Sequence, residues 1–376
     1  MIFKEIQAKT LLRKQKKIDS WFLSRYNMNL YRGCLHACAY CDGRAERYFV
    51  EEEFGQEVAV KINALDILRK ELDPKRKRTP FVPSYIFVGG GVCDSYGPAE
   101  EKYGLTRQTL ELLAENQWPV HILTKSTLVK RDWELLLKIQ KQKGALVSFS
   151  FSSVDPELSA LFEPHAPSPA QRLEAMAFLK SKGLNVGIML MPVIPFITDT
   201  PGLIEGAVRK AKEAGASYVL CSSMTLKPGR QKVHFHEVLE KHYPDLIPVY
   251  TMLYPENNSY GAAIADYFPA VYEIFQHIIK KYNMPQRIPP RFFKRILSEN
   301  DYVVVLLEHM DYVLKSLGRM SAFGYAAYSI SQVAQPLSTM RSEIGKIKGV
   351  GKMVEKVVRE ILETGMAQDY ERLLGG

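Results

Sequence analysis

The sequence predicts an α/β protein: a partial (β/α)6 barrel of the TIM type, followed by a small all-α domain. Two observations lead to this fold class. From Tyr26 to about Met224, short apolar runs alternate with longer amphipathic ones, which is the pattern of βα units that wind a parallel sheet. A basic, Pro-rich stretch then precedes a helical tail with one apolar stripe. We expect a basic N-terminal segment over 1–24, the barrel over 25–225, a helical extension and linker over 226–297, and the all-α domain over 298–376.

Six short apolar runs have the spacing of the strands in such a barrel. Between them, the segments 105–113, 133–139 and 169–179 repeat apolar residues at three- and four-residue steps, which predicts helices. Reactive groups of parallel barrels sit at the carboxyl ends of the strands, so residues that follow these runs are candidate site residues. The predicted strands are Asn27–Tyr31, Tyr85–Val88, Val120–Leu123, Leu146–Phe151, Asn185–Leu190 and Tyr218–Leu220.

Composition and charge exclude several classes of protein. Hydrophobic residues make up 46% of the 376 residues and charged residues 24%, as in an ordinary globular enzyme. No apolar run approaches the roughly 20 residues of a membrane span. The basic N-terminus lacks the apolar core of a secretion signal, so we expect a cytoplasmic protein without a membrane partner. The formal net charge of +9 favours a polyanionic partner.

Three cysteines directly follow the first predicted strand. Cys34, Cys38 and Cys41 leave gaps of three and two residues, enough to hold three irons of a four-iron cluster and leave the fourth open. A structural zinc site would need a fourth ligand, and His36 is badly placed to close a tetrahedron with them. A disulfide framework is less plausible still, because three clustered cysteines out of five leave no even set to pair. The cysteines therefore predict a metal site in a reducing compartment.

The ends of the next strands supply further candidates. Gly89, Gly90 and Gly91 follow the second strand, and without Cβ atoms they let a ligand approach the backbone, although a glycine run is also typical of a plain turn. Lys125 ends the third strand and Ser150 lies near the end of the fourth, with a surface lysine and a buried serine as the alternatives.

The tricysteine loop, with Tyr40 just before its third cysteine, resembles the signature loop of radical S-adenosylmethionine (SAM) enzymes. A further series of motifs, in the same order along the chain, resembles those of one branch of that superfamily, the spore photoproduct lyase-like proteins. This resemblance covers roughly residues 25 to 230. These motifs are Asn27-Met-Asn-Leu-Tyr-Arg-Gly-Cys34, Leu105-Thr-Arg107, Thr124-Lys-Ser126, Arg131-Asp132, Glu163-Pro-His-Ala-Pro-Ser-Pro169 and Met191-Pro-Val-Ile-Pro195.

The resemblance implies a [4Fe-4S] cluster, SAM, and an electron donor such as flavodoxin or ferredoxin. It implies that the three glycines hold the SAM amino group, that Lys125 and Ser150 reach its carboxylate, and that Tyr40 lies near the adenine. It further implies that Cys93 donates a hydrogen atom to a product radical. Bland alternatives stay open for two of these residues: Tyr40 as an aromatic packed under the loop, and Cys93 as a small buried hydrophobe, the role that we expect for Cys221.

The tail carries a second motif. Gly349-Val-Gly351, flanked by Lys348 and Lys352, makes a tight turn ahead of an amphipathic helix, and such amides can hold a phosphate. The run from 301 to 374 resembles the helix-hairpin-helix N-terminal domain of family X DNA polymerases, which implies DNA binding. Val357 stands where some of those polymerases have a lyase lysine, so we expect no lyase activity. The alternative is a helical protein-interaction domain.

Together these features predict a radical SAM enzyme that acts on DNA in repair, by reversing a thymine lesion. Two alternatives remain: a radical SAM enzyme that modifies RNA or a protein, and a non-enzymatic iron-sulfur protein that binds DNA. A purely structural cluster ordinarily uses four protein ligands, which disfavours the latter.

Overall fold

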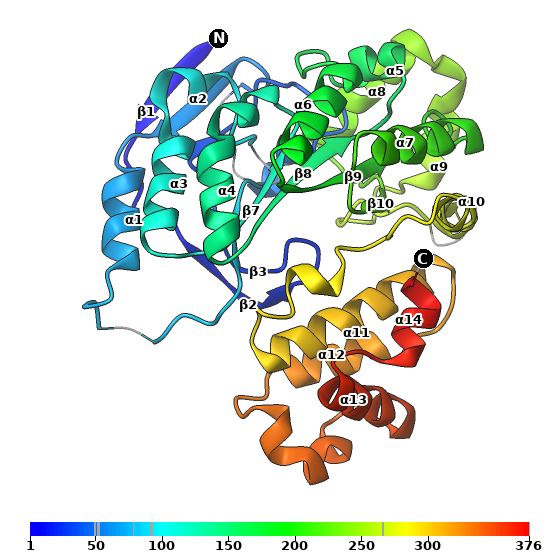
Figure 1. Cartoon of the computed structure of the whole chain (residues 1–376). Helices are drawn as coiled ribbons and strands as arrows, with labels where there is room; N and C mark the ends of the chain where they lie inside the picture. The colour runs from blue at the N-terminus through cyan, green and yellow to red at the C-terminus, as the bar shows by residue number, and fades with distance from the viewer. Residues whose placement is uncertain (49, 51–52, 78, 91–92, 265–266, 376) are drawn as a thin grey trace.

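The computed structural model describes residues 1–48, 50, 53–77, 79–90, 93–264 and 267–375. Its centre is a seven-stranded sheet of order β10-β9-β8-β7-β6-β3-β2 (Figure 1). Neighbouring strands from β3 to β10 are parallel, and β2 pairs antiparallel with β3 at the edge. Six parallel strands, with helices packed along the sheet, confirm the predicted α/β fold of the partial TIM type with a helical region attached (Figure 1).

The strands of this sheet are β2 (Arg13–Asp19), β3 (Ser24–Met28), β6 (Tyr85–Val88), β7 (Val120–Thr124), β8 (Ala145–Phe151), β9 (Asn185–Val193) and β10 (Val219–Ser223). A second, three-stranded sheet contains β1 (Ile2–Ile6), β5 (Glu57–Lys61) and β4 (Tyr31–Arg32), in that order. The helices of the barrel half are α1 (Ala64–Leu72), α2 (Pro98–Tyr103), α3 (Leu105–Glu115), α4 (Trp133–Gln142), α5 (Pro156–Phe162), α6 (Pro169–Ser181) and α7 (Pro201–Glu213). Beyond the barrel follow α8 (Arg230–His242), α9 (Ile247–Leu253), α10 (Tyr267–Lys281), α11 (Glu299–Ser316), α12 (Phe323–Ser331), α13 (Lys352–Thr364) and α14 (Gln368–Leu374).

The first strand lies earlier than predicted. The central-sheet strand ends at Met28, and the chain then leaves it to form β4 against β5. Lys61 stabilises the segment that leaves the sheet. Its backbone N–H donates to the carbonyl of Leu30, and its ammonium donates to the carbonyl of Asn29. The cysteine loop therefore starts from β4, between the two sheets.

The N-terminal segment contains two strands that the sequence analysis did not predict. β2 reads Arg-Lys-Gln-Lys-Lys-Ile-Asp, and within it only Ile18 is buried. A lysine-rich edge strand lacks the apolar alternation by which strands are found in a sequence, although lysine at an edge is a common protection against aggregation.

The tail packs against the barrel and shares its apolar core. Buried residues of α11, including Val303 and Leu307, belong to the same core cluster as the barrel strands. The Pro-rich stretch 287–295, predicted as a linker, is packed as well, since Ile288 and Phe293 are fully buried. In Figure 1, α11 to α14 form a lobe beside β2 and β3. No helix among the described residues has both the length and the apolar character needed to cross a membrane.

Candidate active site

A cavity of about 360 Å³ lies at the carboxyl ends of the parallel strands and gathers most of the predicted site residues. Its walls come from the cysteine loop and from the ends of β6 to β10. The sequence-predicted residues that line it are Cys34, Cys38, Tyr40, Cys41, Gly90, Cys93, Lys125 and Ser150. Residues distant in sequence thus meet at one edge of the sheet.

The cysteine loop is fixed from behind. The guanidinium of Arg44 donates to the carbonyls of Cys38, at 3.1 Å, and Ala37, at 3.0 Å. The side chain of Gln231 donates to the carbonyl of Tyr40 at 2.9 Å. These bonds shape the loop backbone and leave the cysteine side chains directed to the cavity.

The three thiols lie around one cavity, as a cluster site requires. Burial raises the pKa of each, and the neighbouring thiols raise that of Cys34 further, so metal binding must displace their protons. A four-iron cube takes each thiolate on a different iron, so three thiols that line one cavity fit such a cluster.

A carboxylate that the sequence analysis missed joins the loop to the second and third strands. Asp94 accepts hydrogen bonds from His36 Nε2 at 3.0 Å, Thr124 Oγ1 at 2.7 Å and the Lys125 backbone N–H at 2.7 Å. Burial would raise the pKa of Asp94, but the bond to His36 and the other donors lower it to about 2. His36, considered in the sequence only as a zinc ligand, thereby anchors the cysteine loop to an anion at the β6 end.

A second buried network supports Lys125. Its ammonium donates to Ser150 Oγ at 2.8 Å and lies 3.9 Å from a carboxylate oxygen of Glu163. Glu163 also accepts hydrogen bonds from the Tyr40 hydroxyl and from the fully buried Arg172. Burial would raise the pKa of Glu163, but Arg172 and Lys125 lower it to about 2.

Lys125 is therefore a largely buried cation, with 13% of its side chain exposed. Burial would lower its pKa, but the charges of Cys38 and Glu163 overcome this, and the pKa rises. Because Arg172 shares the negative charge of Glu163, the Lys125 ammonium can bind an anionic group presented from the cavity. Tyr40 packs here too, with its ring centroid 5.7 Å from the Lys125 ammonium, and its contact with an adenine stays a prediction.

The fourth cysteine lines the cavity beside Gly90, with which it forms an isolated β-bridge. Cys93 is 8% exposed, and its Sγ is 3.7 Å from Asn29 Oδ1. Burial, and then Asp94, raise the pKa of the Cys93 thiol to about 12. A Cβ on Gly90 would stand 2.3 Å from Asn29 Oδ1, and Gly89 has φ +141°, so both positions require glycine.

Three other candidates have different positions. Gly89 does not line the cavity, and Gly91 lies outside the described residues. Cys221 is buried in β10 and belongs to the apolar core, as expected.

The hairpin residues of the tail do not join this cavity. Lys348, Gly349, Gly351 and Lys352 lie together where the chain enters α13, and Gly349 has φ +82°. Gly351 is the N-cap of α13 and no side chain caps it, so helix amides there are available to a ligand. The tail supplies a separate surface.

Sequence reasoning missed the partners that orient the predicted residues. Glu163 stood within a quoted motif and Asp94 follows Cys93, but neither was considered for a role in the site. Ser222 and Ser223, which end β10, also line the cavity and had no signal in the sequence beyond their place after an apolar run. His36 and Asp94 are 58 positions apart in the sequence, and Tyr40 and Glu163 are 123 positions apart, so only the fold brings each pair together.

Comparisons with known proteins identify related chains. The model of the radical SAM superfamily matches residues 28–205. An uncharacterized protein of Mycobacterium tuberculosis is 32% identical over 256 residues, 67% of this chain and 73% of that protein. An uncharacterized protein of Methanocaldococcus jannaschii is 28% identical over 223 residues, 59% of this chain and 78% of that protein.

Solved structures show the same fold. Spore photoproduct lyase complexed with dinucleoside spore photoproduct is similar over 74% of this chain and 79% of that one, with a TM-score of 0.55 and 16% identity. A mutant of that enzyme with bound AdoMet and dinucleoside spore photoproduct has a TM-score of 0.52 over 72% of this chain and 78% of that one, also at 16% identity. With its tricysteine cavity, its partial barrel and these relatives, the chain belongs to the radical SAM superfamily.

Proposed function

We propose that this radical SAM enzyme acts on DNA and reverses a thymine lesion, as the spore photoproduct lyase-like motifs imply. The observation that carries the proposal is the cavity in which three cysteines face a cation and a fourth, buried thiol. Solved structures of the same fold hold AdoMet and a dinucleoside spore photoproduct, which supports the substrate class.

The family implies a [4Fe-4S] cluster and SAM, and in this chain Cys34, Cys38 and Cys41 would hold the cluster. When bound and reduced, that pair supplies a 5′-deoxyadenosyl radical that removes a hydrogen atom from the substrate. Lys125, held by Ser150 and kept protonated, would bind the SAM carboxylate.

Other predicted residues would complete the SAM site. The glycine run 89–91, of which Gly90 lines the cavity, would bind the amino group, and Tyr40 would pack against the adenine. The role of these residues is to orient the cofactor and exclude water from the radical.

Cys93 would return a hydrogen atom to the product radical. Its raised pKa keeps the S–H bond that such a transfer needs, and it lines the cavity beyond the end of β6. Replacing Cys93 with alanine is expected to divert the product radical to other products, measured by mass spectrometry. Cys221→Ala removes a buried thiol that does not line the cavity and serves as the control. An unchanged product distribution in Cys93→Ala contradicts the donor role.

The tail would bring DNA to this site. Lys348 and Lys352, with the amides around Gly349 and Gly351, would bind backbone phosphates without sequence preference. A thymine lesion would have to leave the base stack to reach the cavity. An electron donor such as flavodoxin or ferredoxin would reduce the cluster.

The decisive experiment is anaerobic turnover with a panel of damaged oligodeoxynucleotides. The reconstituted, reduced enzyme should release 5′-deoxyadenosine. Deuterium placed on the lesion should appear in the released 5′-deoxyadenosine. Cys38→Ala, which removes one cluster ligand, should abolish both signals. If deuterium is transferred from an RNA or protein substrate but not from any DNA substrate, the result favours the alternative, a radical SAM enzyme that modifies RNA or a protein. Failure to release 5′-deoxyadenosine from any substrate would refute the proposal.

A further inference from the structure

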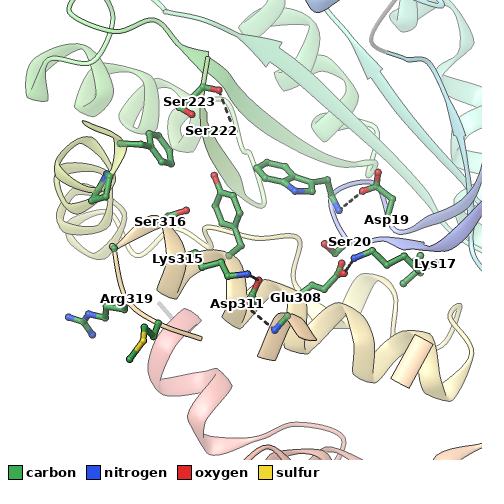
Figure 2. A pocket seen from close by; sticks show the side chains of 18 of the residues that line it. Lys17, Asp19, Ser20, Ser222, Ser223, Glu308, Asp311, Lys315, Ser316 and Arg319 are labelled. Atoms are coloured by element: carbon green, nitrogen blue, oxygen red, sulfur yellow. Dashed lines mark hydrogen bonds and ion pairs between the residues drawn. The ribbon is translucent and has the colours of Figure 1, made fainter. Parts of the chain in front are cut away.

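A cavity of about 1000 Å³ occupies the lateral gap of the partial barrel, between the edge strand β2 and the last strand β10. The tail helix α11 forms its floor, and the start of α12 completes one rim (Figure 2). Its lining includes Lys17 and Trp21 on the β2 side, Ser222 and Ser223 at the β10 end, and Tyr312 and Arg319 from the tail. The cavity exists only because the tail packs on the barrel.

This cavity adjoins the candidate active site. Ser222 and Ser223 line both cavities, and the pairing of β10 with β9 shifts register between Cys221 and Ser223. The two serines are therefore a wall shared by the lateral gap and the tricysteine cavity.

The opposite rim adjoins the hairpin. Gly324 lines the lateral cavity, and the next residue, Tyr325, packs on the hairpin so closely that a Cβ on Gly349 would stand 2.4 Å from its ring. The Lys348 ammonium lies 6.0 Å from the centroid of the Tyr325 ring, which is half exposed. The hairpin thus adjoins, through Tyr325, the rim that α12 gives the lateral cavity.

The lining combines cationic and aromatic groups. Figure 2 shows Lys17 directed to Glu308 and Lys315 to Asp311, and both are ion pairs, the latter at 2.9 Å. These pairs neutralise Glu308 and Asp311, the two acidic groups that α11 contributes to the lining, which also includes Asp19. Among the described residues Arg319 makes no side-chain hydrogen bond or ion pair, so its exposed guanidinium is available to a ligand.

The aromatic groups stand side by side. Trp21 and Tyr312 pack edge to face at 4.9 Å between centroids, and the buried guanidinium of Arg287 fixes both, 4.2 Å and 3.7 Å from their centroids. A free guanidinium at the rim of a cavity and rigid aromatic rings within it are the groups that contact phosphates and bases in single-stranded nucleic acid.

We propose that the lateral cavity is a groove for a single-stranded segment of DNA, which passes from the phosphate-binding hairpin to the radical site. Arg319 contacts a backbone phosphate, and Trp21 with Tyr312 forms the apolar wall against which a base lies. The inference rests on the proposed action on DNA, and it adds the route and the strand form that the site accepts.

The test measures the affinity of the full-length protein for a labelled single-stranded oligodeoxynucleotide at several salt concentrations. Arg319→Gln should weaken binding by about fivefold and reduce the slope of log K against log salt by about 0.7, the change expected for one phosphate contact on a single strand. Arg209→Gln is the matched control, because Arg209 lies on α7, pairs with Glu213 at 2.8 Å and lines neither cavity.

A second measurement tests directly whether the oligodeoxynucleotide lies at the lateral cavity. Met320 is 98% exposed and lines the lateral cavity, so Met320→Cys should cross-link to an oligodeoxynucleotide that carries a thiol-reactive group, whereas Met252→Cys, on α9 and 69% exposed, should not. Equal cross-linking at both positions, or an Arg319→Gln protein with unchanged affinity and salt slope, overturns the groove. If Lys348→Gln still weakens binding in that case, DNA binding by the tail stands. If the unaltered protein binds no DNA, or binds RNA with the same dependence on Arg319 but more tightly, the proposed DNA function fails and the groove assignment with it.

Discussion

Replacing Arg25 with alanine is expected to loosen the tail from the barrel. Arg25, on β3, forms a bidentate pair with Asp301 on α11, with donor–acceptor distances of 2.9 and 2.5 Å. A third bond runs from its guanidinium to the carbonyl of Lys16 at 2.9 Å. The Asp301 side chain is 1% exposed, so water cannot replace the lost donors.

The cost follows from the carboxylate left behind. Removing one member of a buried ion pair strands the other charge, and such truncations destabilise by roughly 3–5 kcal/mol. The exposed Arg209–Glu213 pair, whose side chains are 49% and 59% accessible, offers the matched comparison, and Arg209→Ala should cost less than about 0.5 kcal/mol.

Urea unfolding of the metal-free protein, followed by tryptophan fluorescence, measures both variants, and Trp21 lies at the interface that Arg25 holds. The double variant Arg25→Met with Asp301→Leu should recover most of the loss, because no charge is then left buried. A loss below about 1 kcal/mol in Arg25→Ala, or no recovery in the double variant, would refute the view that this pair fixes the tail.

Three further predictions follow from single residues. Cys38→Ala should leave the purified protein with little cluster iron, measured by iron content and visible absorption, because three thiolates are the minimum set for a cube with one open iron. Gly349→Ala should destabilise the tail by roughly 1–3 kcal/mol and weaken duplex binding, since its φ is +82° and its Cβ would clash with Tyr325, whereas Gly351→Ala meets no atom within 4 Å and should be nearly neutral in thermal unfolding. His309 is buried, and burial, followed by the charge of Arg287, lowers its pKa from about 6.5 to about 3. Between these pH values the unfolded chain binds one proton more than the folded protein, so the free energy of unfolding should be full above pH 6.5 and fall by about 2 kcal/mol by pH 5. His309→Gln should reduce this loss.

The central strands were predictable because they are buried on both faces. Every residue of β8 is buried, and its sequence reads as one apolar run interrupted only by serines. Edge strands gave no such signal: β2 is charged along most of its length and β1 pairs only with β5, so neither shows the burial pattern of an interior strand. The start of the first strand was wrong by three residues because hydrogen bonds from Lys61, distant in sequence, decide where the chain leaves the sheet.

The same distinction applies to the site. Cys34, Cys38 and Cys41 form a local pattern, and their chemistry depends on spacing that a sequence displays directly. The bonds that orient the site join distant residues, such as Tyr40 to Glu163 and His36 to Asp94. Their meeting depends on strand order, which no local motif records.

If the enzyme acts on DNA as proposed, the docked tail constrains how a lesion reaches the site. If the tail moved freely on a linker, the hairpin could deliver DNA in many orientations. Arg287, at the start of the predicted linker, is instead buried between Trp21 and Tyr312, and Tyr312 donates to the carbonyl of Cys221 in β10 at 2.7 Å. The segment around Gly349 and Gly351 is thus held at a fixed position relative to the barrel, and under the proposed function delivery of a lesion would require the DNA rather than the protein to rearrange. Extrusion of the damaged strand into the lateral gap would meet that requirement, because unstacking costs least where the duplex is already damaged.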